Sequence, residues 1–118
     1  MRFLERMFVL PGGVFLLLLI AAALEVLGDA FFQTAVHHSS GLSRWLSSIG
    51  GAVVLSLYGL LVNLPDWNFG RLLGAYVVFF FLVAQVVAKV RFHQPISAPV
   101  LVGGCLIIGG GLIISLWK

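Results

Sequence analysis

Three polar side chains recur at four-residue intervals within the first apolar stretch of the chain: Glu25, Asp29 and Gln33. In an α-helix this spacing places them on one face, so a polar stripe is expected along an otherwise hydrophobic helix. Desolvation disfavours a charged carboxyl group, so Glu25 is expected to hold its proton until a cation replaces it. Two carboxyl groups one turn apart also resist double ionisation. The stripe indicates proton-for-cation exchange, with Glu25 as the deeper group and Asp29 as a second candidate.

Two aromatic side chains are candidates for the wall of such a site. Tyr58 and Tyr76 occupy later apolar stretches, where a ring face could stabilise an organic cation. Aromatic rings in such places also serve as packing, and both interpretations stay open. A structural role is likewise open for Glu25, Asp29 and Gln33, as hydrogen-bonding groups between helices.

Other kinds of chemistry lack the residues they need. The sequence contains no nucleophile paired with a base, no phosphate-binding loop and no metal-ligand cluster. Cys105 is the only cysteine, and the seven Lys and Arg residues are scattered rather than gathered into a nucleic-acid-binding patch. The sequence therefore predicts a protein that is not an enzyme, with no cofactor, no metal and no nucleic-acid partner.

The composition is that of a membrane protein. Hydrophobic residues make up 61% of the chain and charged residues 9%, and the mean hydropathy is +1.14. A helix needs roughly 20 apolar residues to cross the hydrocarbon core, so four spans use nearly the whole length. The first stretch is too long for the core of a signal peptide and is expected to be a mature helix. We expect an all-α protein with a single four-helix transmembrane domain over residues 1–118.

Turn residues and interfacial side chains divide the chain into four expected helices, at about 12–36, 46–64, 72–88 and 96–116. The connections are short, so neighbouring helices must be antiparallel in an up-down-up-down bundle. Positive charges are then nearly balanced, because Arg2, Arg6, Arg71 and Lys118 fall on one side and Arg44, Lys89 and Arg91 on the other. This balance allows insertion in both orientations; the alternative is one orientation set by the two N-terminal arginines.

Glycines are concentrated in the fourth expected helix. Gly103 and Gly110 are seven residues apart and share one face, and Gly104 and Gly111 repeat that spacing. Such stripes of small residues let membrane helices approach closely, so this helix is the candidate dimer interface. The alternative is packing within the monomer.

Several segments together resemble one known family. They are Leu24-Glu25-Val26-Leu27-Gly28, the turn Ser39-Ser40-Gly41-Leu42-Ser43-Arg44, the segment Gly70-Arg71-Leu72-Leu73-Gly74-Ala75-Tyr76, and Gln94, Pro99, Gly103 and Gly110. In this order they resemble the small multidrug resistance transporters of the drug/metabolite transporter superfamily, most closely their YnfA-like branch. The resemblance covers about residues 20 to 116.

The resemblance implies an antiparallel homodimer in a bacterial inner membrane, in which two Glu25 side chains face one cavity and bind protons or a cationic substrate. It places Tyr76 where better-known members carry a substrate-facing tryptophan, and Gln33 where many carry lysine. The chain departs from the family at Val78 and Phe80, where the family's third helix bends at glycines, and at Asp29, which replaces a small or hydroxyl residue.

The expected function is therefore proton-coupled antiport that exports small organic cations, such as quaternary ammonium, guanidinium or polyamine compounds. The partners are a second copy of the chain, or a paralogue in a heterodimer, together with the substrate, protons and the lipid bilayer. Two alternatives stay open: a non-pumping subunit of a heteromeric lipid-sugar flippase, whose known examples generally lack this glutamate, and a structural membrane subunit.

Overall fold

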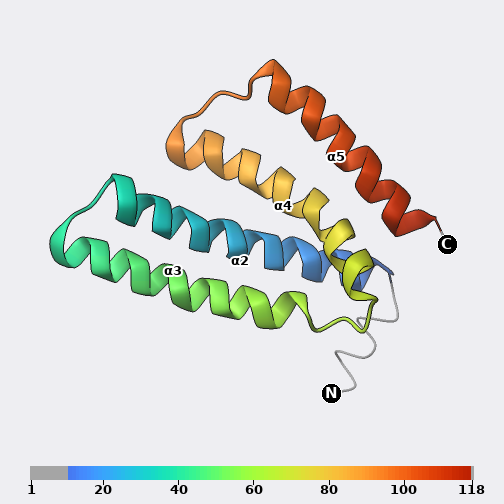
Figure 1. The fold of residues 1–118 in the computed structure, drawn as a ribbon, viewed down its shortest axis with the longest axis horizontal. Helices are drawn as coiled ribbons and strands as arrows, with labels where there is room; N and C mark the ends of the chain where they lie inside the picture. The colour runs from blue at the N-terminus through green and yellow to red at the C-terminus, as the bar shows by residue number, and fades with distance from the viewer. Residues whose placement is uncertain (1–10, 118) are drawn as a thin grey trace. The chain divides into compact units, whose positions relative to one another are not determined.

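The computed structural model describes residues 11–117 and contains four helices in this range. They are α2 (Pro11–His37), α3 (Gly41–Val62), α4 (Phe69–Phe92) and α5 (Ala98–Leu116), shown in Figure 1. Each is long and apolar enough to cross a membrane, and no strand occurs in the described part. The predicted all-α class with four spans is confirmed. Arg2, Arg6 and Lys118, which enter the charge balance, lie outside the described residues.

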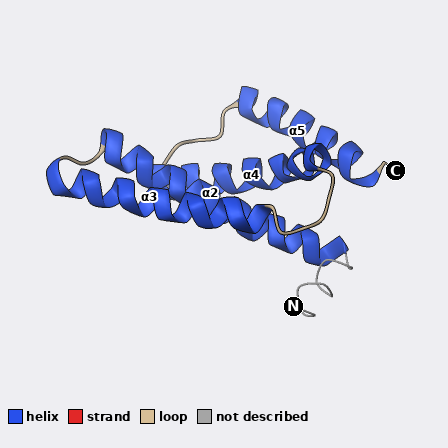
Figure 2. Cartoon of the chain, turned by 60° about the horizontal axis from the view of Figure 1, so that its bottom comes forward, coloured by secondary structure: helices blue, strands red, loops and turns tan. Residues whose placement is uncertain are grey.

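Two helices begin earlier than the sequence patterns predict. α3 starts at Gly41 rather than near residue 46, because Gly41 adopts a positive φ of 60° that turns the chain directly into the helix. α4 starts at Phe69 rather than near residue 72, because Oδ1 of Asn68 accepts hydrogen bonds from the N–H groups of Gly70 and Arg71 at 3.1 and 3.5 Å. The first and second connections are correspondingly short, and only loops join the helices (Figure 2).

The chain divides into two compact units, and the first of them, Met1–Pro65, contains α2 and α3. These helices lie side by side as an antiparallel hairpin (Figures 1 and 2). Their contact is made through glycines: a Cβ atom at Gly28 would lie 2.6 Å from the Leu55 side chain, and one at Gly51 would lie 2.8 Å from the Phe32 ring. The absence of side chains at Gly28 and Gly51 therefore sets how closely α2 and α3 approach.

The connection between α2 and α3 is held by side chains that bind the C-terminal end of α2. Arg44 donates from Nε to the carbonyl oxygen of Ala35 at 2.9 Å and from Nη2 to that of Ser39 at 3.0 Å. The hydroxyl of Ser39 donates to the carbonyl oxygens of Thr34 and Ala35 at 3.0 and 3.2 Å. The last carbonyl groups of a helix have no partner within it, so these bonds complete the end of α2.

The second unit, Asp66–Lys118, contains α4 and α5. A Cβ atom at Gly104 would lie 2.5 Å from Cζ of Phe81, and one at Gly111 would overlap the side chain of Val78. Near the other end of the pair, Nη2 of Arg71 donates to the carbonyl oxygen of Ser115 at 3.0 Å. These contacts join the two helices along their lengths.

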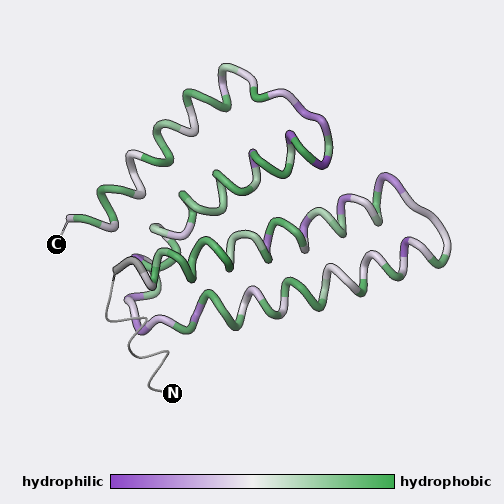
Figure 3. The backbone as a smooth tube through the Cα atoms, turned by 180° about the vertical axis from the view of Figure 1, so that it is seen from behind, coloured by the Kyte–Doolittle hydropathy of each residue, from purple (hydrophilic) through white to green (hydrophobic). Residues whose placement is uncertain are grey.

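Polar residues gather at the connections, as expected for a chain that crosses a membrane. Figure 3 shows hydrophobic colour along the four helices and hydrophilic colour at the turns. Hydrophilic colour also interrupts α2 along its middle and its C-terminal half. α2 carries the two acidic side chains of the described spans, Glu25 and Asp29, and it is the helix of the predicted polar stripe.

Two glycines of α3 are expected to respond differently to substitution by alanine, because an added side chain would meet α2 at Gly51 and open space at Gly59. Gly51→Ala is expected to destabilise the protein by about 1–3 kcal/mol, because the new Cβ would crowd Phe32 and the carbonyl oxygen of Gly28, 3.0 Å away. Gly59→Ala, also in α3, meets nothing within 4 Å and is expected to be neutral or to stabilise the helix by up to about 1 kcal/mol. Thermal unfolding in detergent, followed by circular dichroism, tests this; equal melting temperatures for the two variants would contradict it.

At the α4–α5 contact, the loss of stability caused by one substitution is expected to be partly reversed by a second substitution on the facing helix. Gly111→Ala is expected to lower the melting temperature, and Val78→Ala in the same chain is expected to recover part of the loss, because it removes the overlapping methyl groups. Gly109→Ala serves as the matched control, since nothing lies within 4 Å of that position. Additive effects of Gly111→Ala and Val78→Ala would show that the two residues do not contact each other.

Candidate functional site

Glu25 lies near the middle of α2. With a rise of 1.5 Å per residue, it is about 20 Å from each end of the helix, and thus near the centre of a hydrocarbon core that is about 30 Å thick. Apolar residues precede and follow it in the helix, and its side chain is half-buried. A carboxyl group at this depth has no bulk water beside it to stabilise a charge.

The residues of the predicted polar stripe lie progressively further from the contact between α2 and α3. Gly28 faces α3, and Glu25 is about 60° around the helix from it. Asp29 and Gln33 continue the stripe further from α3, and both side chains are exposed. The three residues share one helical face, as their spacing predicts, with one half-buried and two exposed members. The exposed carboxyl group of Asp29 requires water, further protein or a ligand beside it within the membrane.

Tyr58 lies at the same level of the hairpin as Glu25. Gly28 of α2 packs against Leu55 of α3. Because the helices are antiparallel, the next turn of α3, which carries Tyr58, lies opposite the preceding turn of α2, which carries Glu25. Tyr58 is half-buried and shares with Leu55 the side of α3 that meets α2. The first unit thus brings one aromatic candidate to the level of the central carboxyl group.

Tyr76 belongs to the second unit. It lies in the N-terminal half of α4 and is buried, and its ring centroid is 6.3 Å from that of Phe80. Phe80 is one of the two positions at which the sequence departs from the glycines of the transporter family it resembles. A substrate-facing role for Tyr76 stays a prediction.

The two glycine stripes of α5 have different environments. A Cβ atom at Gly103 or Gly110 would meet nothing within 4 Å, so this stripe is an open surface. Gly104 and Gly111 are buried against Phe81 and Val78 of α4. The structure therefore assigns Gly104 and Gly111 to packing inside the unit, the alternative considered for them, and leaves Gly103 and Gly110 as the face available to a partner.

Two arginines have bonding roles that the sequence patterns did not predict. Arg44 begins α3 and binds the end of α2, and Arg71 begins α4 and binds the end of α5. The guanidinium of Arg71 also lies over the Trp67 ring, 5.2 Å from its centroid. An arginine in the first turn of a span, next to the end of another span, is the signal that could have indicated this role.

Comparison with known proteins identifies one curated relative. The chain is 36% identical over 77 residues to a UPF0060 membrane protein of Herpetosiphon aurantiacus, and the match covers 64% of this chain and 69% of the relative. No model of a protein family and no solved structure matches the chain. Identity of this degree over most of the relative's length establishes common descent, and the four spans agree with the relative's description as a membrane protein. The chain therefore belongs to the UPF0060 family of membrane proteins.

Proposed function

We propose that this multi-pass membrane protein is a proton-coupled antiporter that exports small organic cations. The observation that carries the proposal is the pair of carboxyl groups, Glu25 and Asp29, on one face near the centre of a membrane span. An intramembrane acid is costly and typically marks an ion or substrate path. The resemblance of the segment around Glu25 to the small multidrug resistance transporters supports the same interpretation.

Exchange follows from the electrostatics of a carboxylate in hydrocarbon. An uncompensated charge at the bilayer centre costs at least a few kcal/mol, so Glu25 must be neutralised by its own proton or by a bound cation. The two modes are mutually exclusive at one carboxyl group. Release of a proton is therefore required for cation binding, and cation release favours protonation, which couples the two fluxes in opposite directions.

An organic cation suits the surroundings of Glu25 better than a small metal ion. Magnesium and calcium need six or more oxygen ligands, whereas this level of the hairpin offers a few carboxyl oxygens and an aromatic ring. The ring of Tyr58, at the level of Glu25, can stabilise a quaternary ammonium or guanidinium group through its face. The substrate is moved and not chemically changed, so the protein is proposed to act without catalysis or cofactor.

The transporting unit is proposed to be an antiparallel homodimer in a bacterial inner membrane. The exposed carboxyl group of Asp29 needs cover within the membrane, and the open Gly103 and Gly110 stripe provides a face without side chains on which a second α5 can pack. The nearly equal numbers of positive residues on the two sides permit the opposite insertion of two copies. A second copy would supply a second Glu25, as the resemblance to the small multidrug resistance transporters implies.

Removal of the central charge is expected to abolish coupled transport. In proteoliposomes with a proton gradient, the parent protein is expected to accumulate one or more members of a panel of quaternary ammonium, guanidinium and polyamine compounds. Glu25→Gln keeps the shape but cannot ionise, and is expected to reduce uptake by more than about tenfold, since a few kcal/mol of charge compensation is lost. Asp66→Asn removes an exposed carboxylate from the connection between α3 and α4 and is expected to leave uptake unchanged.

Asp29→Asn in the same assay tests whether the second carboxyl group is part of the site. A larger loss for doubly charged polyamines than for singly charged cations is expected, because two carboxylates can compensate two charges. The antiport proposal fails if no cation is accumulated by the parent, or if Glu25→Gln transports as well as the parent.

The dimer face is tested separately from transport. Gly110→Leu is expected to shift the purified protein from dimer to monomer in detergent, because the new side chain would fill the open stripe, where a Cβ atom meets nothing within 4 Å. Gly109→Leu adds the same side chain on a neighbouring face of α5 and is the matched control. Light scattering coupled to gel filtration gives the mass of each; equal dimer fractions for both variants would exclude the Gly103 and Gly110 face.

A further inference from the structure

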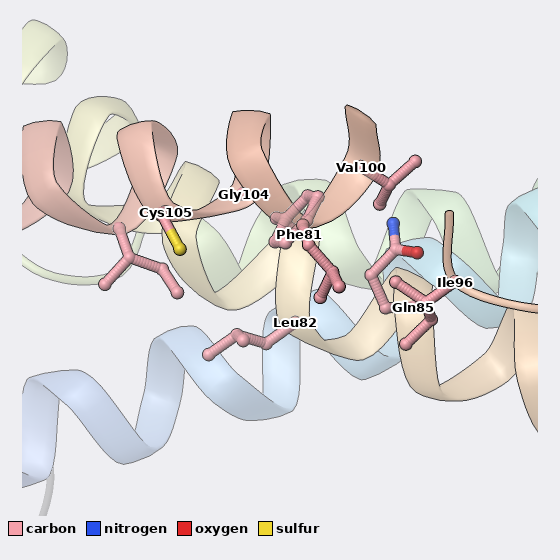
Figure 4. Close-up of a pocket in the computed structure, with 9 residues that line it drawn as sticks. Phe81, Leu82, Gln85, Ile96, Val100, Gly104 and Cys105 are labelled. Atoms are coloured by element: carbon pink, nitrogen blue, oxygen red, sulfur yellow. The ribbon is translucent and has the colours of Figure 1, made fainter. Parts of the chain in front are cut away.

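A pocket of about 200 Å³ lies between α4 and α5, entirely within the second unit. Its wall is apolar, although two of the residues that line it, Gln85 and Cys105, carry an amide and a thiol. Figure 4 shows these groups at opposite ends, with Gln85 next to Ile96 and Val100, and Phe81 and Gly104 between them. Gly104 and the Phe81 ring pack closely against each other in this wall, since a Cβ atom at Gly104 would lie 2.5 Å from Cζ of Phe81.

The position of the pocket in the membrane spans indicates that it faces lipid. Both helices that line it are membrane spans, and Leu82 and Leu101 in its wall have exposed side chains. Along α5 the pocket extends from Val100 to Ile108, about 12 Å, which is less than half of a hydrocarbon core about 30 Å thick. Val100 is two residues from the start of α5 at Ala98, so the pocket lies in the half of the span next to that end, where the surrounding molecules are lipid chains.

A positive charge lies at the connection end of the pocket. Lys89 follows Gln85 by four residues and Leu82 by seven, so it lies on the same face of α4, one turn nearer the membrane surface. Its side chain is exposed, and α4 ends three residues later at Phe92. The N-terminus of α5, which begins at Ala98 beside the same end, adds the positive partial charge of a helix start.

We propose that this pocket binds one acyl chain of an anionic phospholipid, with the phosphate-bearing headgroup next to Lys89. The apolar wall fits the chain, and the lysine fits the negative headgroup. A cationic amphiphile in the same pocket would place its charge beside Lys89, where like charges repel. The pocket is thus a lipid site and not an entrance for the cations of the proposed transport, and the inference does not depend on that transport.

The sole cysteine makes the site measurable in the native sequence. The Cys105 thiol lies at the deep end of the pocket and is accessible, so a bound chain should shield it from N-ethylmaleimide. The alkylation rate is measured for the purified full chain in detergent, titrated with phosphatidylglycerol or with phosphatidylcholine of the same chain length. Phosphatidylglycerol is expected to slow alkylation at lower concentration than phosphatidylcholine.

A matched pair of charge variants assigns the headgroup. Lys89→Gln is expected to raise the phosphatidylglycerol concentration needed for half protection about fivefold, corresponding to roughly 1 kcal/mol for one cation beside an anionic headgroup. Arg91→Gln removes an equal charge two residues away on another face, where the guanidinium lies over the Phe92 ring, and is expected to behave as the parent. Circular dichroism and native mass spectrometry of bound lipid accompany both variants.

Three results would overturn the proposal. Equal protection by the two lipids would show a pocket that does not select a charged headgroup. Equal losses in Lys89→Gln and Arg91→Gln would show general attraction to the basic end of α4. Protection that depends on protein concentration and not on lipid would show that a second copy of the chain covers the pocket.

Discussion

Hydrocarbon offers no hydrogen-bonding partner, so every backbone polar group within the membrane must be paired inside the protein. The four helices meet this requirement along their lengths, and the remaining problem is at their ends. Here the chain uses side chains in or next to the connections: Asn68 binds the first N–H groups of α4, and Arg44 and Ser39 bind the last carbonyl groups of α2. These two helix ends are thus completed by residues next to the turn.

Against this background the carboxyl groups of Glu25 and Asp29 are exceptional, because an ionised carboxyl group brings a net charge into the hydrocarbon, which a paired backbone does not. A proton, a cation or a polar protein surface can each lower the cost of that charge. The same residues therefore give reasons both for exchange and for assembly. The proposed antiport and the proposed dimer both follow from the cost of an acidic charge within the membrane.

The sequence was a good guide to features that depend on one helix and a poor guide to features that depend on two. The number of spans and the common face of Glu25, Asp29 and Gln33 follow from hydropathy and helical spacing alone, and the structure agrees. The early start of α3 was missed, because Ser39, Ser40 and Gly41 are typical of a turn and the helix begins at the glycine itself.

Properties of helix pairs required the structure. The two glycine stripes of α5 have identical spacing, and only Phe81 and Val78 of α4 distinguish the packed stripe from the open one. The level of Tyr58 relative to Glu25 likewise depends on the register of α2 against α3. The boundary at Asn68 could have been read from the sequence, since asparagine is a preferred residue before a helix.

The hydrogen bonds of Arg44 and Arg71 also affect the electric field at the membrane surfaces. Each arginine lies at the positive end of its own helix and binds carbonyl groups at the negative end of a neighbouring helix, which carries about half an elementary charge of opposite sign. Each guanidinium charge is thus partly compensated within the fold. Each arginine therefore adds less positive potential at its end of the helix pair than the same charge would without a helix C-terminus beside it.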